Sequence, residues 1–353
     1  MPEAGARVSF RYDAPEIVPR SYVEDLSGIV NGRCVEADAY TLGGTVGEFE
    51  RRFADMVGKE MAVFMPTGTL ANHLAVRALA GTRRRVLVQE RSHLYNDSGD
   101  CLQSLSGLNV VPLGHGQATF TLEEVQASVR ATATSRVRVG IGVIVIETPV
   151  RRKHGEMFDQ KEMKRVCSYA KEEKIGLHLD GARLFIASAY SGISPAAYAA
   201  DFDTVYVSLY KYFGTPGGAV LAGSASLLEN IYHERRMFGG ALNQAWMFAA
   251  AAMTHMNGFS ERFAPVVLAS EAFKRQLGAT SGFRVGEIPN GTNVFRLELD
   301  PMVETEKFQT YLQRVGIWLP RPENGAFYLK VNESMLAMTP DLLTQRFEEA
   351  LRV

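Results

Sequence analysis

The chain has 353 residues, of which 46% are hydrophobic, and its 38 basic and 39 acidic side chains leave a net charge of −1. A disordered chain needs few apolar residues and a high net charge, so that class is excluded. The sequence also lacks the basic excess that favours nucleic-acid binding. The length predicts about two domains.

The cysteine and targeting patterns favour a cytoplasmic protein. Cys34, Cys101 and Cys167 match no metal or disulfide spacing, which suits a reducing compartment and predicts no metal site. Residues 1–20 lack the apolar stretch of a signal peptide. The longest apolar run, 245–253, is far shorter than the ~20 residues of a membrane span. It predicts a buried helix, and we expect no membrane partner.

In chain order, the first 257 residues alternate predicted helices and strands. Apolar residues at helical spacing predict helices at 46–56, 70–80, 122–130 and 160–174. Short apolar runs predict strands at 61–65, 85–88, 110–113, 139–146, 176–179, 204–208 and 219–222. This alternation predicts a mostly parallel sheet covered on both faces, with a ligand at the carboxyl ends of its strands.

The pattern changes after residue 257. Strands are predicted at 283–285, 292–297 and 326–331, and a helix at 340–351. These elements predict a smaller α+β domain at 258–353, which follows a large domain at 46–257.

Two polar segments follow predicted strands and suggest an anion site. In PTGTLAN (66–72), a turn with Thr67, Gly68 and Thr69 opens a helix, which predicts either a cradle for a phosphate or an ordinary threonine-capped helix. In HLDGAR (178–183), Asp180 ends a buried strand. Its carboxylate either pairs with Arg183 or holds a pyridinium nitrogen in its protonated form.

Two further segments carry candidate reactive groups. Lys211 lies between aromatic residues just after a buried strand, where burial would lower its pKa and make the amine nucleophilic. The alternative is a lysine whose stem lies on apolar surface while the amine reaches water. His93, in a predicted polar loop with Ser92 and Tyr95, either stacks on an aromatic cofactor, acts as acid or base, or is simply solvated.

Together these segments resemble the threonine aldolase/β-eliminating lyase family of pyridoxal-phosphate enzymes, which have the fold-type I aminotransferase architecture. The resemblance runs from about residue 11 to 258 and is strongest in HLDGARLF (178–185) and SLYKYFGTPGGAVLAG (208–223). It implies an α/β fold, with a large mostly parallel sheet domain, a small C-terminal α+β domain, and an N-terminal arm (1–45) that contributes to the active site. It also implies a homodimer or homotetramer with shared active sites.

The resemblance assigns roles to individual residues. Lys211 is similar to the lysine that holds pyridoxal 5'-phosphate as an aldimine, Asp180 to the partner of the pyridine nitrogen, and His93 to the imidazole over the ring. The phosphate is assigned to Thr67, Gly68, Thr69 and Ser208. Arg183 is expected beside the cofactor and the substrate carboxylate, with Tyr40 as a further substrate-binding residue.

The chain departs from the family pattern around the substrate. Tyr210 replaces the usual serine before the lysine, and Asn243 stands where an arginine typically reaches the phosphate from the neighbouring subunit. The C-terminal strand lacks its usual arginine, so Arg321 is the candidate substitute. A basic run, Arg151-Arg152-Lys153-His154, follows the Glu147 segment as either a solvated loop or a part of the active-site mouth.

We therefore expect an aldolase that cleaves a β-hydroxy-α-amino acid, of the threonine or allo-threonine kind, to glycine and an aldehyde. His93 is the candidate base for the substrate hydroxyl. One alternative is β-elimination to a keto acid and ammonia, with Lys211 as the base. Another is a pyridoxal-phosphate-binding protein with little catalysis. The sequence leaves the natural aldehyde and the preference at Cβ open.

Overall fold

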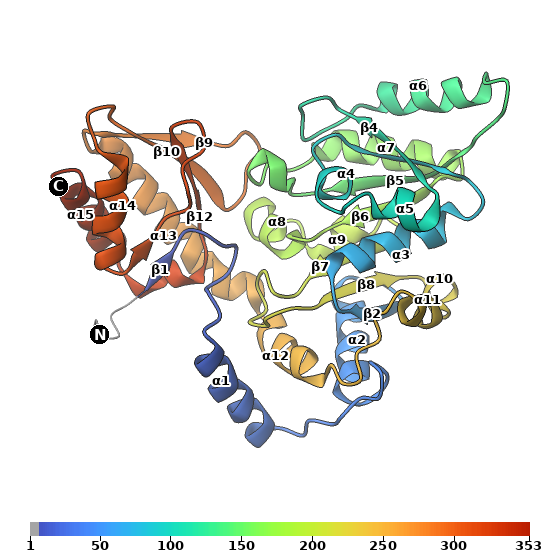
Figure 1. The fold of residues 1–353 in the computed structure, drawn as a ribbon, viewed down its shortest axis with the longest axis horizontal. Coiled ribbons are helices and arrows are strands. Elements are labelled where there is room, and N and C mark those ends of the chain that lie inside the picture. The colour runs from blue at the N-terminus through green and yellow to red at the C-terminus, as the bar shows by residue number, and fades with distance from the viewer. Residues whose placement is uncertain (1–6) are drawn as a thin grey trace. The chain divides into compact units, whose positions relative to one another are not determined.

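The computed structural model describes residues 7–353, so the first six residues of the expected N-terminal arm lie outside it. The chain forms two compact units (Figure 1). The large unit is Pro19–Asn257, and the small unit combines Gly258–Val353 with residues 7–18. Among the described residues, no helix combines the length and the apolar character that a membrane crossing requires.

A seven-stranded sheet forms the centre of the large unit, in the order β2-β8-β7-β6-β5-β3-β4. Its strands are β2 (Met61–Met65), β3 (Arg85–Gln89), β4 (Asn109–Leu113), β5 (Ile141–Glu147), β6 (Gly176–Asp180), β7 (Thr204–Ser208) and β8 (Ala219–Gly223). Only β8 runs antiparallel to its neighbours, and the pairs from β7 to β4 are all parallel. The predicted mostly parallel sheet is confirmed.

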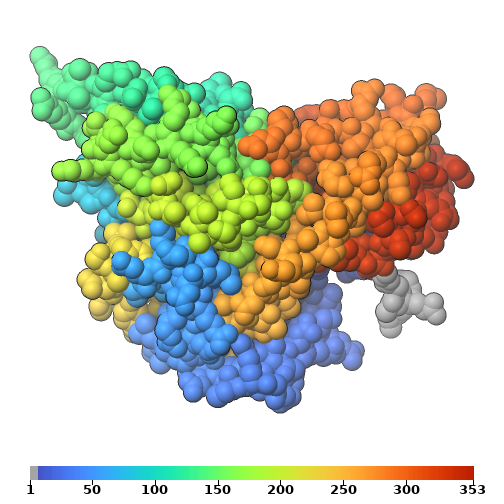
Figure 2. Space-filling model, turned by 180° about the vertical axis from the view of Figure 1, so that it is seen from behind, coloured from blue at the N-terminus to red at the C-terminus, as the bar shows by residue number. Residues whose placement is uncertain are grey.

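Helices cover both faces of this sheet, which is why its central strands are apolar throughout. Every residue of β5 and β7 is buried. The helix α3 (Gly68–Ala80) packs across β5 to β8, and α2 (Gly44–Met56) packs on β2 and β8. Seen from behind, the green residues around α7 (Gln160–Glu172) and the yellow-green residues that follow them form part of the surface of the large unit (Figure 2).

The remaining helices of the large unit include several that the sequence pattern did not predict. The remaining helices are α1 (Pro19–Gly32), α4 (His93–Asn96), α5 (Cys101–Ser106), α6 (Leu122–Ala133), α8 (Leu184–Ser191), α9 (Pro195–Ala199), α10 (Ala225–Leu228), α11 (Ile231–Met237), α12 (Trp246–Met256) and the 3-10 turn η1 (Arg151–Lys153). Of these, α6 and α12 were predicted from the runs 122–130 and 245–253, and the others were not. The loop predicted around His93 is wrong in detail. The Ser92 hydroxyl accepts from the Tyr95 N–H and starts α4, and Leu94 is buried.

The small unit contains a three-stranded antiparallel sheet in the order β12-β10-β9. Its elements are β1 (Val8–Ser9), α13 (Phe259–Ala279), β9 (Phe283–Glu287), β10 (Val294–Leu299), α14 (Thr305–Arg314), β11 (Ile317–Trp318), β12 (Ala326–Lys330), η2 (Glu333–Ala337) and α15 (Pro340–Ala350). Rings from α13, α14 and α15 pack together, with Phe347 at 5.1 Å from Phe273 and 5.8 Å from Phe308. The predicted α/β class with a small α+β unit is confirmed.

Candidate active site

The predicted site residues of the large unit follow the carboxyl ends of neighbouring strands. Asp180 ends β6, Ser208 ends β7, and Lys211 lies three residues beyond Ser208. His93 follows β3 as the first residue of α4. The charges of Asp180 and Lys211 both act on the His93 imidazole, so these three groups lie in one electrostatic environment.

The predicted anion cradle lies at the start of α3. The Thr67 hydroxyl accepts a hydrogen bond from the Leu70 N–H at 3.2 Å, so it caps the helix. A helix leaves its first N–H groups without partners inside the helix, and these groups favour a negative charge. Thr67 therefore caps the helix, which was the alternative to phosphate binding. The N–H groups of Gly68 and Thr69 lie in the first turn of α3, and their binding of a phosphate stays a prediction.

Two buried hydroxyls belong to β7, the strand that faces this helix. Ser208 Oγ is buried and has no well-formed hydrogen bond among the described residues, although it interacts with the Tyr206 hydroxyl and lowers the pKa of that group. A buried polar atom that is so weakly bonded costs free energy unless a ligand or water completes its hydrogen bonds. The Tyr206 hydroxyl lies against Gly68, where an added Cβ would overlap it. Burial raises the pKa of Tyr206 well above its ordinary value, so this hydroxyl stays protonated and able to donate.

We expect Gly68→Ala to weaken cofactor binding. The added methyl would overlap the Tyr206 ring, and overpacking of this kind costs about 1–3 kcal/mol, or roughly 5- to 150-fold in affinity. The measurement is a titration of apoenzyme with pyridoxal 5'-phosphate. Gly47→Ala, whose new Cβ meets its nearest neighbour at 3.7 Å, is the matched control, and Gly68→Ala/Tyr206→Val should recover part of the loss. Wild-type affinity in the single variant would refute this description of the cradle.

Asp180 is held by a chain of buried hydrogen bonds. Its Oδ2 accepts from Asn72 Nδ2 at 2.7 Å, Asn72 Oδ1 lies 2.8 Å from His178 Nε2, and His178 Nδ1 lies 2.7 Å from the Thr204 hydroxyl. Because the Asn72 amide donates to Asp180, its oxygen must accept from His178. Burial lowers the pKa of His178 to about 4, so the ring is neutral at neutral pH, and Nδ1 accepts from Thr204. Thr204 therefore donates to His178, His178 donates to Asn72, and Asn72 donates to Asp180.

The second oxygen of Asp180 is also bonded. Oδ1 accepts from the Ala182 N–H at 3.2 Å, and the carboxylate is almost fully buried. Arg183 is buried at the start of α8, and its charge acts on Glu147 and Tyr206. A carboxylate fixed on both oxygens suits the predicted pairing with a pyridinium nitrogen.

Glu147 connects the two loops on the other side of Asp180. It is the strand partner of Asp180, and its two oxygens accept from the backbone N–H groups of His93 at 2.5 Å and Arg151 at 2.8 Å. Burial, reinforced by Asp180, raises the pKa of Glu147 to about 7. Burial also lowers the pKa of His93, so its imidazole is neutral at neutral pH and able to accept a proton.

Lys211 lies in a turn that aromatic residues anchor. Its amine is 5.5 Å from the centre of the Tyr210 ring, which is half exposed. The Tyr212 hydroxyl donates to the Ala182 carbonyl at 3.1 Å, which ties the lysine turn to the segment after Asp180. Gly214 has φ +62°, a conformation that glycine adopts readily, and it closes the turn.

Tyr40, the predicted substrate-binding residue, lies beside Asn243, where the family typically has an arginine. The Tyr40 N–H donates to the Asn243 carbonyl at 2.9 Å, and the Arg236 guanidinium lies 4.6 Å from the Tyr40 ring centre. Arg235 is fully buried and donates to the carbonyls of Phe64 at 2.6 Å and Thr41 at 3.2 Å. Arg235 therefore fastens the Tyr40 segment to the end of β2.

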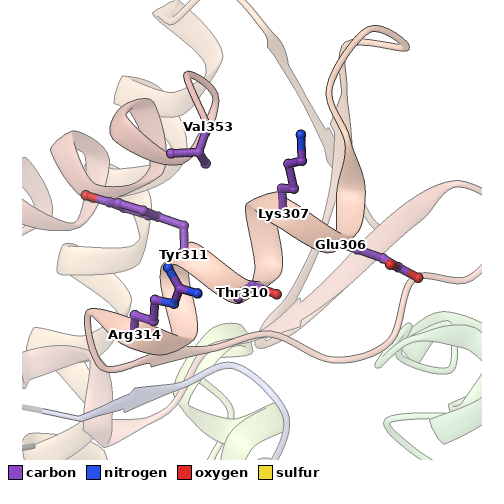
Figure 3. A pocket seen from close by; sticks show the side chains of 6 residues that line it. All are labelled: Glu306, Lys307, Thr310, Tyr311, Arg314 and Val353. Atoms are coloured by element: carbon purple, nitrogen blue, oxygen red, sulfur yellow. The ribbon is translucent and has the colours of Figure 1, made fainter.

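Arg321, the remaining predicted site residue, lies in the small unit, where it is exposed between β11 and β12. That unit also has a surface hollow of about 330 Å³ beside α14 (Figure 3). The residues that line it are Glu306, Lys307, Thr310, Tyr311, Arg314 and Val353. None of these six is a predicted site residue, so the hollow does not compete with the large unit as the candidate site.

Four residues of the site had no role in the sequence-based prediction: Asn72, Glu147, His178 and Tyr206. Signals for two of them were present. Asn72 follows Gly68 by one helical turn, and His178 precedes Asp180 by two residues on the same face of its strand. The contacts of Glu147 and Tyr206 join distant segments, which no spacing along the chain reveals.

The comparisons with known proteins agree with this geometry. Residues 30–287 match the model of a family described as beta-eliminating lyase. A low-specificity L-threonine aldolase from Arabidopsis thaliana is 24% identical over 321 residues, 90% of each chain. Another from Candida albicans is 30% identical over 247 residues, which cover 69% of this chain and 64% of that protein.

A solved structure extends the similarity to the fold. A Listeria monocytogenes protein provisionally named an L-allo-threonine aldolase superposes with a TM-score of 0.80 at 25% identity. The alignment covers 98% of this chain and 95% of that one, so both units have counterparts in a single known architecture.

Proposed function

Because the chain belongs to the beta-eliminating lyase family, we propose that it cleaves a β-hydroxy-α-amino acid of the threonine or allo-threonine kind to glycine and an aldehyde. The family consists of pyridoxal-phosphate enzymes, and pyridoxal 5'-phosphate is the cofactor of this chain. The observation that carries the proposal is the buried Asp180, held on both oxygens in one electrostatic environment with Lys211 and His93.

The described residues fit this cofactor. The α3 N-terminus and the buried Ser208 hydroxyl offer donors to a phosphate, and Asp180 offers a fixed negative charge to a ring nitrogen. Lys211 would hold the cofactor covalently through its amine. When bound, the cofactor supplies a ring that accepts the electron pair left on the substrate's Cα.

The chain's own groups then act on the substrate. Arg183 would bind the α-carboxylate and so orient the Cα–Cβ bond, since orientation decides which bond breaks. The neutral His93 would take the proton of the β-hydroxyl through a ring nitrogen. The Cα–Cβ bond then breaks, Cβ leaves as the aldehyde carbon, and a proton returned to Cα completes glycine.

The name of the matched family favours a second candidate, β-elimination. That reaction breaks the Cα–H bond, with Lys211 as the base, and expels the β-substituent to give a keto acid and ammonia. It leaves His93 without a hydroxyl proton to accept. The position of His93 beside Lys211 is compatible with either reaction, so the products must separate them.

Product analysis tests the proposal. The purified holoenzyme is incubated with L-threonine, L-allo-threonine or phenylserine, and glycine plus aldehyde are measured beside keto acid plus ammonia. Glycine and aldehyde in equal amounts are the expected products. Keto acid and ammonia would replace the aldolase with the lyase, and a bound cofactor without turnover of any amino acid would indicate a binding protein.

We also propose a cytoplasmic homodimer or homotetramer with shared active sites, as the family resemblance implies. Exposed apolar side chains near the Tyr40 segment, among them Leu42 and Met237, support such a contact. Light scattering measures the assembly mass directly. A mass near the 38.9 kDa of one chain would contradict the proposal.

A further inference from the structure

The basic segment η1 lies beside His93, because one buried carboxylate fixes both. Glu147 accepts from the N–H of His93, at the start of α4, and from the N–H of Arg151, at the start of η1. Asp97, which caps the other end of α4, pairs with Arg152 through two bonds of 2.7 and 3.0 Å. The two arginines therefore lie next to α4, the short helix that begins at the candidate base His93.

The charges in this cluster do not balance. Arg151 and Arg152 share the single carboxylate of Asp97, and Arg151 reaches it only at 3.4 Å. The neighbouring Lys153 is neutralised by Glu156 at 3.6 Å. Beside these groups lies the buried Glu147, whose charge acts on Arg152 and whose pKa of about 7 leaves it only partly ionised at neutral pH. Two guanidinium groups therefore face one full and one partial negative charge, and the partial positive charge that remains suits a monoanion such as a carboxylate.

The two arginines are placed to meet a ligand. Their side chains are 51% and 43% exposed. Arg152 uses the Nε–Nη2 edge of its guanidinium on Asp97, so a ligand would meet its Nη1 side, whereas Arg151 contacts Asp97 only through Nη1. A guanidinium presents its donors as a planar fork that matches a carboxylate. The charge of Arg151 lowers the pKa of His93, a minor effect beside burial, which shows that its field reaches the candidate catalytic imidazole.

We propose that Arg151 and Arg152 bind a second carboxylate, carried on the β-substituent of the amino acid substrate. This inference rests on the proposed function and names its substrate class as β-hydroxy amino acids with an acidic side chain. The simplest example is 3-hydroxyaspartate. Its β-hydroxyl proton passes to His93, the Cα–Cβ bond breaks, and Cα takes a proton, so that one molecule gives one glycine and one glyoxylate.

Substrate competition tests the proposal in the holoenzyme. The values of kcat/KM for 3-hydroxyaspartate and for L-threonine are compared in wild type, Arg151→Gln and Arg152→Gln. Loss of a charge-assisted hydrogen bond should lower the value for 3-hydroxyaspartate about 10-fold and leave L-threonine within about twofold. Arg165→Gln, which is also half exposed and paired with two glutamates, is the matched control and should change neither value.

The remaining outcomes separate the subsite from the reaction. An equal loss for both amino acids would place the arginines on the α-carboxylate, and unchanged values would leave them as surface charges, so either result overturns the proposal. Dissociation constants, measured from the absorption change of the bound cofactor, cover the case in which neither amino acid is cleaved. The proposed function then fails, but tighter binding of 3-hydroxyaspartate that depends on Arg151 still supports the subsite.

Discussion

Lys211→Ala is expected to abolish covalent attachment of pyridoxal 5'-phosphate and to lower kcat/KM by roughly 10³-fold or more, the scale seen when a covalent catalyst is removed. The amine is the only reactive group that the substitution removes. The turn should keep its shape, because Tyr212 and the backbone bond from the Phe213 N–H to the Leu209 carbonyl hold it without the amine. Borohydride reduction followed by mass spectrometry of the peptides locates the attachment.

The control for this experiment is Lys171→Ala, which removes a half-exposed lysine that pairs with Asp201 on the surface. It should keep both the visible absorption band of the bound cofactor and the activity. The central assignment fails if Lys211→Ala still carries the cofactor covalently or if the reduced wild-type protein bears it on a different lysine.

The strands of the large sheet were predictable because a strand buried on both faces must be apolar throughout. The predicted bounds of 61–65 and 204–208 match β2 and β7, and the order of strands and helices implied the parallel arrangement. Short helices such as α4 were not predictable, since α4 depends on one serine cap. By contrast, α13 shows helical spacing in its buried residues Phe259, Phe263, Val266, Ser270, Phe273 and Leu277, so its signal was present despite Pro265.

The site divides in the same way. Lys211, Asp180 and His93 could be selected as candidates from the sequence, because their chemistry stands out where a buried strand ends, and their roles stay predictions. What holds them was not, because those contacts join residues far apart in sequence. Asn72 reaches Asp180 across 108 positions, and Glu147 reaches His93 across 54. Only the folded sheet shows that a glutamate and an asparagine orient the candidate catalytic groups.

The second large effect is expected at Asn72, the residue that links Asp180 to His178. Asn72→Leu keeps a similar volume but leaves a buried carboxylate oxygen and the His178 Nε2–H without partners. An unsatisfied buried group of this kind costs about 1–3 kcal/mol, so cofactor affinity and kcat should fall by roughly 5- to 150-fold. The visible absorption spectrum of the bound cofactor, recorded as a function of pH, should change as well, since the charge that faces the ring nitrogen is no longer held in place.

Thr204→Val provides the graded comparison. It removes the donor at the far end of the chain and leaves the bond from Asn72 to Asp180 in place, so its effect on the cofactor spectrum should be the smaller of the two. A role in folding alone would lower the unfolding temperature of both variants and leave the spectrum and its pH dependence as in wild type. That result would show that the hydrogen bonds among Thr204, His178 and Asn72 support the core without positioning Asp180. A spectral change in Asn72→Leu larger than that in Thr204→Val is the pattern that only a positioning role explains.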